Sequence, residues 1–193
     1  MNLNISKLEQ LLKIKILNKN LFRESLIHKS ASKVKNNEKL EFLGDIVIGL
    51  ILSKKLLDLY PDENEGSIDK RFAKLVNRKT CASISWSLGV QNYILLGDKN
   101  KKITKKDEKI LSDACEALIG AIFLDRGYEY VKNFVLRAWQ NQISNSYVTT
   151  LDSKTQLQEY SLKINKKFVG VGNSKQKAQQ KAANNFLKEN NLI

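Results

Sequence analysis

Apolar residues along the first 145 positions recur at steps of three and four, which is the period of an amphipathic helix. Polar stretches separate these periodic segments, and none of the segments alternates as a strand would. The pattern therefore predicts a mainly α fold for this part of the chain. Predicted helices cover 5–17, 21–27, a long segment from 38 to about Tyr60, a segment following Ser67, one ending near Gly89, one containing 111–119, and a last one through Val131 and Trp139.

Local signals predict where several of these helices end. Pro61, the single proline, should stop the long helix because proline lacks an amide donor and clashes with the preceding turn. Ser67 follows a turn at Glu65–Gly66 and is expected to cap the next helix. The segment from Lys99 to Lys109 holds six lysines and two acids, which indicates a mobile loop or an exposed helix start.

The chain changes character after the last predicted helix. A polar run without apolar periodicity, Ser144–Ser153, is interpreted as a linker, with its core at 146–153. It divides a larger domain, 1–145, from a small one, 154–193. The small domain is expected to contain a helix at Thr155–Ile164, an extended piece at Phe168–Gly172 and a second helix at Lys175–Glu189.

Composition adds a strong charge. The 193 residues include 33 Lys and Arg against 20 Asp and Glu, a net charge of +13. Such an excess favours polyanionic partners, nucleic acid above all and an anionic membrane surface second, although a solvated lysine face would give the same count. Cys81 and Cys115 have no metal-site spacing, and His28 alone makes no zinc site. Without a leader or a long apolar run, we expect a cytoplasmic protein and no membrane partner.

Carboxylates interrupt two apolar segments, 38–48 and 111–119. On a helix, Glu38, Glu41 and Asp45 would share an arc of roughly 60°, and Asp113 and Glu116 would share another. Buried carboxylates are costly unless a cation meets them, and hard divalent cations prefer oxygen ligands. A metal site acting on a polyanion is one interpretation. Ordinary solvated acids of a first helical turn are the other, and spacing alone leaves both open.

These segments carry a family resemblance. Asn37–Asp45, which reads NEKLEFLGD, resembles the signature of bacterial ribonuclease III, and Asp113–Asp125 resembles the second acidic motif of that family. His28–Ser30 and Leu75–Arg78 match the intervening pattern in order and spacing. The resemblance implies an all-helical catalytic domain followed by a small α/β double-stranded-RNA-binding domain.

The resemblance also implies roles for single residues. Glu38 and Glu65 match acids that lie in the cleft and contact RNA, and Phe42 matches an aromatic inserted into the partner of a homodimer. Asp45 and Glu116 would be catalytic, with activity depending most on Glu116. The implied metal ligands are Glu41, Asp45, Asp113 and Glu116.

The implied activity is Mg²⁺-dependent hydrolysis of double-stranded RNA, with Mn²⁺ as a substitute. The products would carry 5′-phosphate and 3′-hydroxyl ends, and the targets would include ribosomal RNA precursors, messenger RNA and other structured RNA. No serine or histidine nucleophile is needed. Two alternatives stay open: a non-catalytic double-stranded-RNA-binding protein that keeps the fold, and a helical protein–protein module with solvated acids.

The small domain departs from the family pattern. Thr155–Tyr160 resembles the first helix of a double-stranded-RNA-binding domain, and Gly170–Ala183 resembles the last strand edge and second helix. Only nine residues, Asn165–Asn173, lie between the two helices, enough for one strand and not three. We therefore expect a truncated domain with weak RNA affinity, which strong hydrogen-exchange protection of Phe168–Val171 would contradict. Its candidate phosphate contacts are Ser174, Lys175, Lys177 and Lys181, unless these only form a solvated face.

Overall fold

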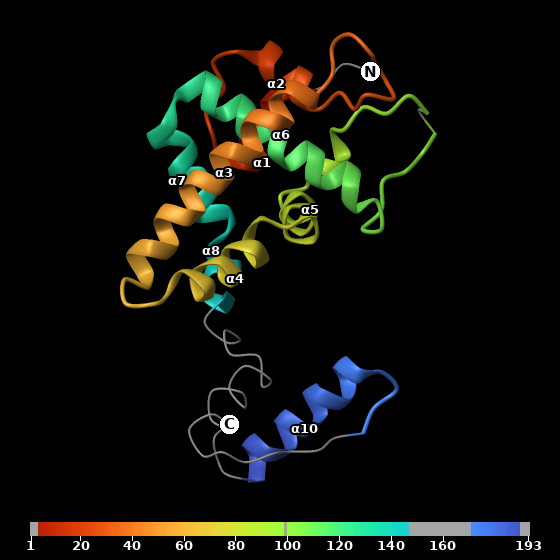
Figure 1. Ribbon diagram of the computed structural model, residues 1–193. Coiled ribbons are helices and arrows are strands. Elements are labelled where there is room, and N and C mark those ends of the chain that lie inside the picture. The colour runs from red at the N-terminus through yellow and green to blue at the C-terminus, as the bar shows by residue number, and fades with distance from the viewer. Residues whose placement is uncertain (1–3, 99, 147–170, 190–193) are drawn as a thin grey trace. The chain divides into compact units, whose positions relative to one another are not determined.

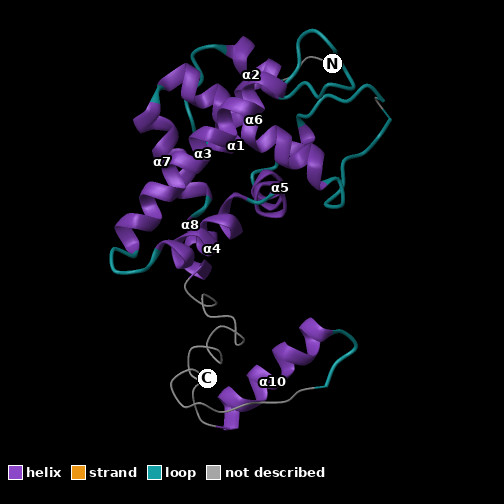
Figure 2. Ribbon diagram, viewed as in Figure 1, coloured by secondary structure: helices purple, strands orange, loops and turns teal. Residues whose placement is uncertain are grey.

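The computed structural model describes residues 4–98, 100–146 and 171–189 of the chain. It divides into two compact units, Met1–Ser146 and Tyr147–Ile193. The described residues are mainly helical and include no strand, as the apolar periodicity predicts (Figure 2). The helices are α1 (Ile5–Leu12), α2 (Lys19–Ser25), α3 (Glu38–Leu59), α4 (Glu65–Val76), α5 (Arg78–Ser87), the 3₁₀ turn η1 (Val90–Asn92), α6 (Glu108–Arg126), α7 (Tyr128–Ala138), α8 (Gln140–Asn145) and α10 (Lys175–Glu189).

The first unit is built around the crossing of α3 and α6, which make its most extensive helix–helix contact (Figure 1). Eleven of the nineteen residues of α6 are buried. This burial explains why α6 is apolar on nearly every side: α2, α3, α5 and α7 all pack against it. The carboxylates of its acidic motif therefore project from the most buried helix of the unit.

Two glycines allow α3 and α6 to approach until their backbones touch. A Cβ atom added at Gly44 of α3 would lie 1.7 Å from the carbonyl oxygen of Glu116. A Cβ added at Gly120 of α6 would lie 2.2 Å from the carbonyl oxygen of Leu40. The group that approaches Gly44 is therefore the backbone of Glu116, one of the predicted metal ligands.

Two predicted helix boundaries are wrong. The first helix ends at Leu12 and not at Leu17, because Lys13 adopts a left-handed conformation (φ 53°) and its amide donates back to the carbonyls of Gln10 and Glu9. The amide of Leu17 instead donates to the Asp125 carboxylate, at 2.9 Å.

The cap of α4 also differs from the prediction. Asn64, not Ser67, is the N-cap, since its side-chain oxygen accepts from the Ser67 amide at 3.0 Å. At the other end of α3, the helix stops at Leu59, two residues before Pro61, as predicted. Among the helices that the structure describes, none combines the length and apolarity needed to cross a bilayer.

In the second unit the structure describes residues 171–189. The helix α10 has the predicted bounds, and the Ser174 hydroxyl accepts from the Lys177 amide at 3.2 Å at its start. Ala182, Ala183 and Phe186 form its buried face. The predicted helix at Thr155–Ile164 and most of the extended piece lie outside the described residues.

Candidate metal centre

Three of the four predicted metal ligands meet where α3 crosses α6. Glu41 comes from the first turn of α3, and Asp113 and Glu116 project from one face of α6. One carboxylate oxygen of each lies within 4.8 Å of those of the other two. The backbone contact at Gly44 lets carboxylates on two different helices come this close.

Asp45 lies at the margin of this group. It lines the same cavity, of about 310 Å³, as Glu41 and Glu116, but it is not among the three acids whose oxygens converge. Its side chain is exposed, although the apolar run around it suggested burial. The neighbouring Ile46 is itself 53% exposed, so the run does not mark a core position here.

The clustered acids disfavour one another's ionised forms. The pKa of Glu116 is raised to about 7, by burial first and then by the charges of Asp45, Glu41 and Asp113, against a hydrogen bond from Ser112 that lowers it. The Ser112 hydroxyl donates to this carboxylate at 2.7 Å. The pKa of Glu41 is also raised, by burial first and by Asp113 next. A divalent cation would relieve this repulsion, so the donor set fits a hard metal ion.

A lysine occupies the open side of Asp113. The Lys109 ammonium lies 3.1 Å from the Asp113 carboxylate, whose side chain is only 8% exposed. Sequence reasoning missed this ion pair, although Lys109 and Asp113 have the i, i+4 spacing that places side chains together on a helix. The Lys109 ammonium therefore brings one positive charge to the edge of the acidic cluster.

Glu38 is engaged elsewhere. Its carboxylate pairs with the Lys29 ammonium at 3.1 Å, with both side chains about half exposed. Lys29 therefore holds the pKa of Glu38 below its usual range. Both residues line the cavity beside Glu41, which fits the predicted role of Glu38 as a cleft neighbour and not a metal ligand.

The remaining candidates lie apart from the three converging acids. Glu65 opens α4, is exposed, and does not line the cavity. In the second unit the four predicted phosphate contacts are exposed at the start of α10 and along it: Ser174, Lys175, Lys177 and Lys181.

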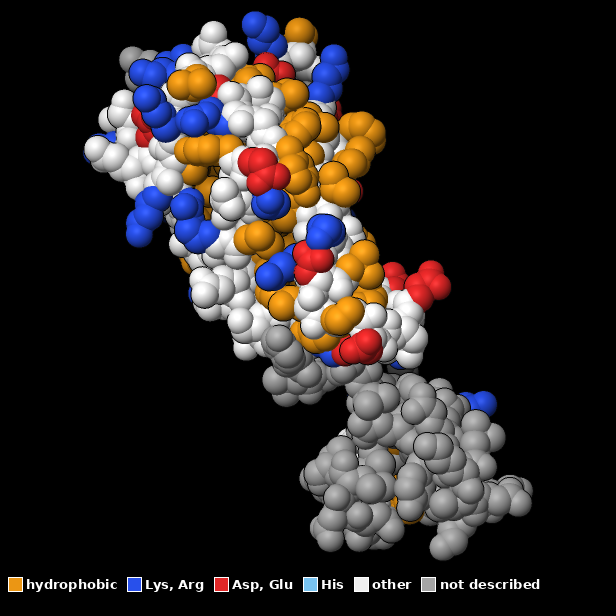
Figure 3. Space-filling model, turned by 90° about the vertical axis from the view of Figure 1, so that its left-hand side faces the viewer, with side chains coloured by type: hydrophobic (Ala, Val, Ile, Leu, Met, Phe, Trp, Pro, Cys, Tyr) orange, Lys and Arg blue, Asp and Glu red, His pale blue; other side chains and the backbone are white. Residues whose placement is uncertain are grey.

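An exposed apolar face runs along α3 beside the site. Its four members are spread over an arc of about 80° on the helix, and between 53% and 71% of each is exposed. Figure 3 shows hydrophobic side chains gathered in a band on the side of the first unit that it displays. The face, called the α3 apolar face below, consists of Phe42, Ile46, Leu50 and Leu57.

Comparison with known proteins gives one consistent result. A family model described as ribonuclease-III-like matches residues 18–143. Ribonuclease 3 of Pelagibacter ubique is 53% identical over 165 residues, which cover 85% of this chain and 74% of that protein. Ribonuclease 3 of Buchnera aphidicola is 32% identical over 216 residues and 95% of each chain.

Solved structures agree. The nuclease domain of ribonuclease III from Campylobacter jejuni superposes with a TM-score of 0.69 at 42% identity, covering 73% of this chain and 99% of that domain. That structure is described as flexible in a region involved in dimer formation. Dicer from Pichia stipitis, at 21% identity and a TM-score of 0.58, shares the fold.

Proposed function

This chain belongs to the ribonuclease III family and is an endoribonuclease of that type, and from that membership we propose that it cuts double-stranded RNA with Mg²⁺ as a homodimer. The observation that carries the proposal is the convergence of Glu41, Asp113 and Glu116 to within 4.8 Å. The proposed targets are ribosomal RNA precursors, messenger RNA and other structured RNA in the cytoplasm.

The three converging acids would hold the metal, and Asp45 would complete the cage from its margin. Mg²⁺ takes oxygen ligands and usually keeps several waters, which suits a cluster with one open side. Mn²⁺ would serve as a substitute. When bound, such a cation supplies Lewis-acid activation of water and neutralises charge on the scissile phosphate.

The protein's own groups prepare this site. Because the pKa of Glu116 is about 7, this side chain must give up its remaining proton when the cation binds. The Ser112 hydroxyl keeps the Glu116 carboxylate oriented throughout, through the 2.7 Å hydrogen bond. Hydrolysis would leave a 5′-phosphate and a 3′-hydroxyl, and no side-chain nucleophile takes part.

Charge and exposed apolar surface support the proposed partners. The net charge of +13 favours the phosphate backbone of RNA, and exposed lysines of α10 would add contacts in the second unit. Glu38 lines the cavity beside the metal ligands, whereas Glu65 would contact RNA from outside it, at the start of α4. The α3 apolar face supports the homodimer, since a band of this kind beside a polar cleft is typical of an interface.

Cleavage of a long RNA duplex in Mg²⁺ tests the proposal. Glu116→Ala should cut at least about a thousandfold more slowly than the wild type, because a bound metal lowers the activation barrier by several kcal/mol. It should still bind the duplex. Asp62→Ala, which removes an exposed acid from the turn after α3, is the matched control and should cut normally.

Two outcomes would contradict the proposal. If the wild type binds duplex RNA but never cuts it, the non-catalytic alternative holds instead. If duplex affinity does not fall steeply with salt, phosphate contacts do not account for the positive charge.

A further inference from the structure

A second cavity, of about 380 Å³, lies between α5 and the start of α6. Its volume is within the range of small-ligand pockets, roughly 300–1,000 Å³. None of the acids of the candidate metal centre lines it. The proposed cleavage chemistry therefore leaves this cavity without a role.

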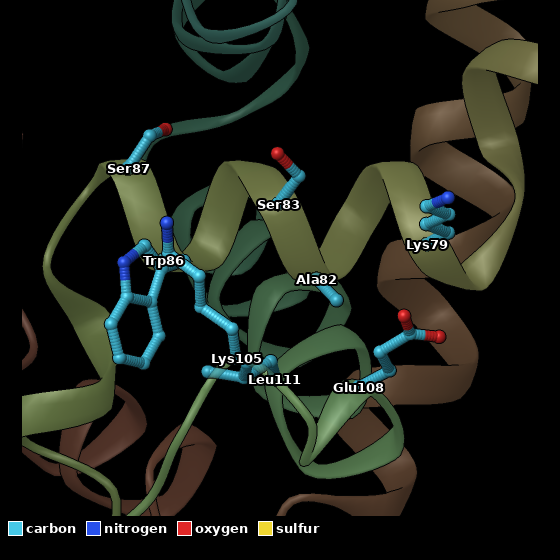
Figure 4. Close-up of a pocket in the computed structure, with 8 residues that line it drawn as sticks. All are labelled: Lys79, Ala82, Ser83, Trp86, Ser87, Lys105, Glu108 and Leu111. Atoms are coloured by element: carbon cyan, nitrogen blue, oxygen red, sulfur yellow. The ribbon is translucent and has the colours of Figure 1, made fainter.

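The cavity has an aromatic end. Figure 4 shows the Trp86 indole beside the Lys105 side chain, with Ala82 and Leu111 between this end and the opposite one. The Lys105 ammonium lies 5.8 Å from the centre of the Trp86 ring. An indole face with an apolar floor is suited to stacking of a flat, polarisable ring.

The opposite end is polar. Lys79 and Glu108 lie there, away from Trp86 (Figure 4). Among the residues that the structure describes, Lys79, Lys105 and Glu108 form no ion pair, whereas Lys101 pairs with Asp107 at 2.8 Å. The cavity thus has a cation at each end, Lys105 over the Trp86 ring and Lys79 at the end that also holds the Glu108 carboxylate.

We propose that this cavity binds one unpaired nucleotide of the RNA strand, a step that rests on the proposed function. The base lies against Trp86, and the phosphates on its two sides meet Lys105 and Lys79. A nucleotide within a strand carries a phosphate on each side, which matches cations at both ends better than a free phosphate would. A base stacked inside a duplex has both faces covered, so only an unpaired nucleotide in a bulge, loop or overhang can enter.

Glu108 gives the cavity a preference among bases. A carboxylate accepts from exocyclic amino groups such as cytosine N4 or adenine N6. Uracil has no such group. Adenosine should therefore bind more tightly than uridine, and the difference should become smaller in Glu108→Ala, leaving the part that comes from the stronger stacking of a purine.

Tryptophan fluorescence of the full-length protein reports on binding directly. The chain has two tryptophans, and Trp139 is fully buried, so a ligand in the cavity should quench Trp86. The probes are adenosine 3′,5′-bisphosphate, uridine 3′,5′-bisphosphate and inorganic phosphate. We expect saturable quenching by the nucleotides and none by phosphate at the same concentration. The quenching should be lost in Trp86→Phe, whose unchanged thermal midpoint would show that it folds.

Binding measured by calorimetry separates stacking from charge. Trp86→Ala should weaken adenosine bisphosphate binding at least about tenfold, since stacking on an aromatic ring is a large part of single-strand affinity. Trp86→Phe should lose less. Lys79→Ala and Lys105→Ala should each weaken binding about threefold to tenfold. Lys7→Ala, which removes an exposed lysine from α1, is the matched control and should bind as the wild type does.

A binding experiment with RNA distinguishes this inference from the proposed function. In metal-free Glu116→Gln, a duplex with a one-nucleotide bulge should bind more tightly than a fully paired duplex of equal length, and Trp86→Ala should abolish the difference. Equal effects of Lys7→Ala and Lys79→Ala, or quenching by phosphate alone, would overturn the nucleotide site. If the site fails while the wild type still cuts paired duplex, the proposed function stands. If nucleotides bind but no duplex is ever cut, only the proposed function fails.

Discussion

Glu116 is held in a position where its charge is poorly tolerated. It is partly buried against α3, and three other carboxylates face it. With a pKa raised to about 7, its carboxyl group binds a proton far more readily at neutral pH than an ordinary glutamate does. Protons and divalent cations should therefore compete for this one side chain, and metal affinity should fall as the pH drops below 7.

The same shift makes Glu116 destabilising in the metal-free protein at alkaline pH. A carboxyl whose pKa rises from an ordinary 4.5 to about 7 on folding contributes stability at low pH, and loses it as the pH rises between these values. Glu116→Gln should therefore unfold at a higher temperature than the wild type at pH 8, with a chelator present. Allowing for partial exposure, we expect about 1 kcal/mol, or roughly 2–4 °C in the midpoint. At pH 4.5 and below the two should converge, and Asp62→Asn serves as the control. Identical midpoints at pH 8 would contradict the shift.

Lys109 should oppose cation binding. The Lys109 ammonium lies 3.1 Å from the Asp113 carboxylate and must move away before this carboxylate can coordinate a metal ion. Lys109→Met should bind Mn²⁺ severalfold more tightly in calorimetry or electron paramagnetic resonance, because no ion pair has to be broken. Lys106→Met removes a charge from the preceding loop, where Lys106 has no ion pair with a described residue, and should change affinity less. Equal affinities in the two variants would mean that only the overall charge matters.

The sequence predicted the carboxylates of the site better than their surroundings. Helical spacing placed Asp113 and Glu116 on one face, and they do project together. Helical spacing could not predict that Asp45 is exposed, because the period of a helix gives the direction of a side chain and not how far neighbouring elements cover it. The Ser112 hydrogen bond was also missed, although Ser112 and Glu116 have the i, i+4 spacing that brings two side chains together on a helix.

At the scale of helices, the contact between α3 and α6 is the feature most sensitive to substitution. Gly44→Ala would place a Cβ 1.7 Å from the Glu116 carbonyl, and a backbone atom cannot move aside as a side chain can. We expect a loss of about 3 kcal/mol in the free energy of unfolding, together with weaker metal binding as the helices separate. Denaturant unfolding measures the first and calorimetry the second.

Gly49, also in α3, provides the matched control. A Cβ there would lie 3.5 Å from the Phe72 ring, an ordinary contact. Gly49→Ala should therefore be neutral or stabilise α3 by up to about 1 kcal/mol, the usual gain in helix propensity. A Gly44→Ala protein as stable as Gly49→Ala would show that the two helices can shift apart freely.

Helix prediction succeeded where local signals decide. Pro61 lies two residues beyond the end of α3, and the predicted bounds of α10 match the structure. It failed where a distant residue decides. The segment after Leu12 keeps a helical apolar pattern, yet Asp125, far along the chain, accepts the amides of Leu17 and Asn18 and holds this segment in another conformation. No local pattern contains that information.

For the molecule as a whole, the α3 apolar face leads to a prediction about assembly. Leu50 is 55% exposed, so Leu50→Lys should not disturb the folded chain but should weaken the proposed dimer by about a hundredfold or more. Sedimentation at micromolar concentration would detect the shift to monomer. Leu124→Lys changes a leucine of similar exposure, 53%, on α6 and should leave the assembly unchanged. A wild type that sediments as a monomer would contradict the homodimer.

The sequence and the structure cover the two units unequally. The apolar period predicted the mainly α architecture of the first unit, and the family resemblance is shown by its relatives. The shortened segment between the helices of the second unit, Asn165–Asn173, lies largely outside the described residues. The expectation of a single strand and weak RNA affinity there stays a prediction.

The contact of Gly44 with the backbone of α6 also determines which part of the site can adjust to an ion. A bound cation attracts carboxylates from both helices and would draw them inward. Atoms of two main chains already touch at the crossing, so α3 and α6 cannot follow that pull. Ions of different radius would therefore be accommodated by rotation of the Glu41, Asp113 and Glu116 side chains, while the distance between the two helices stays constant.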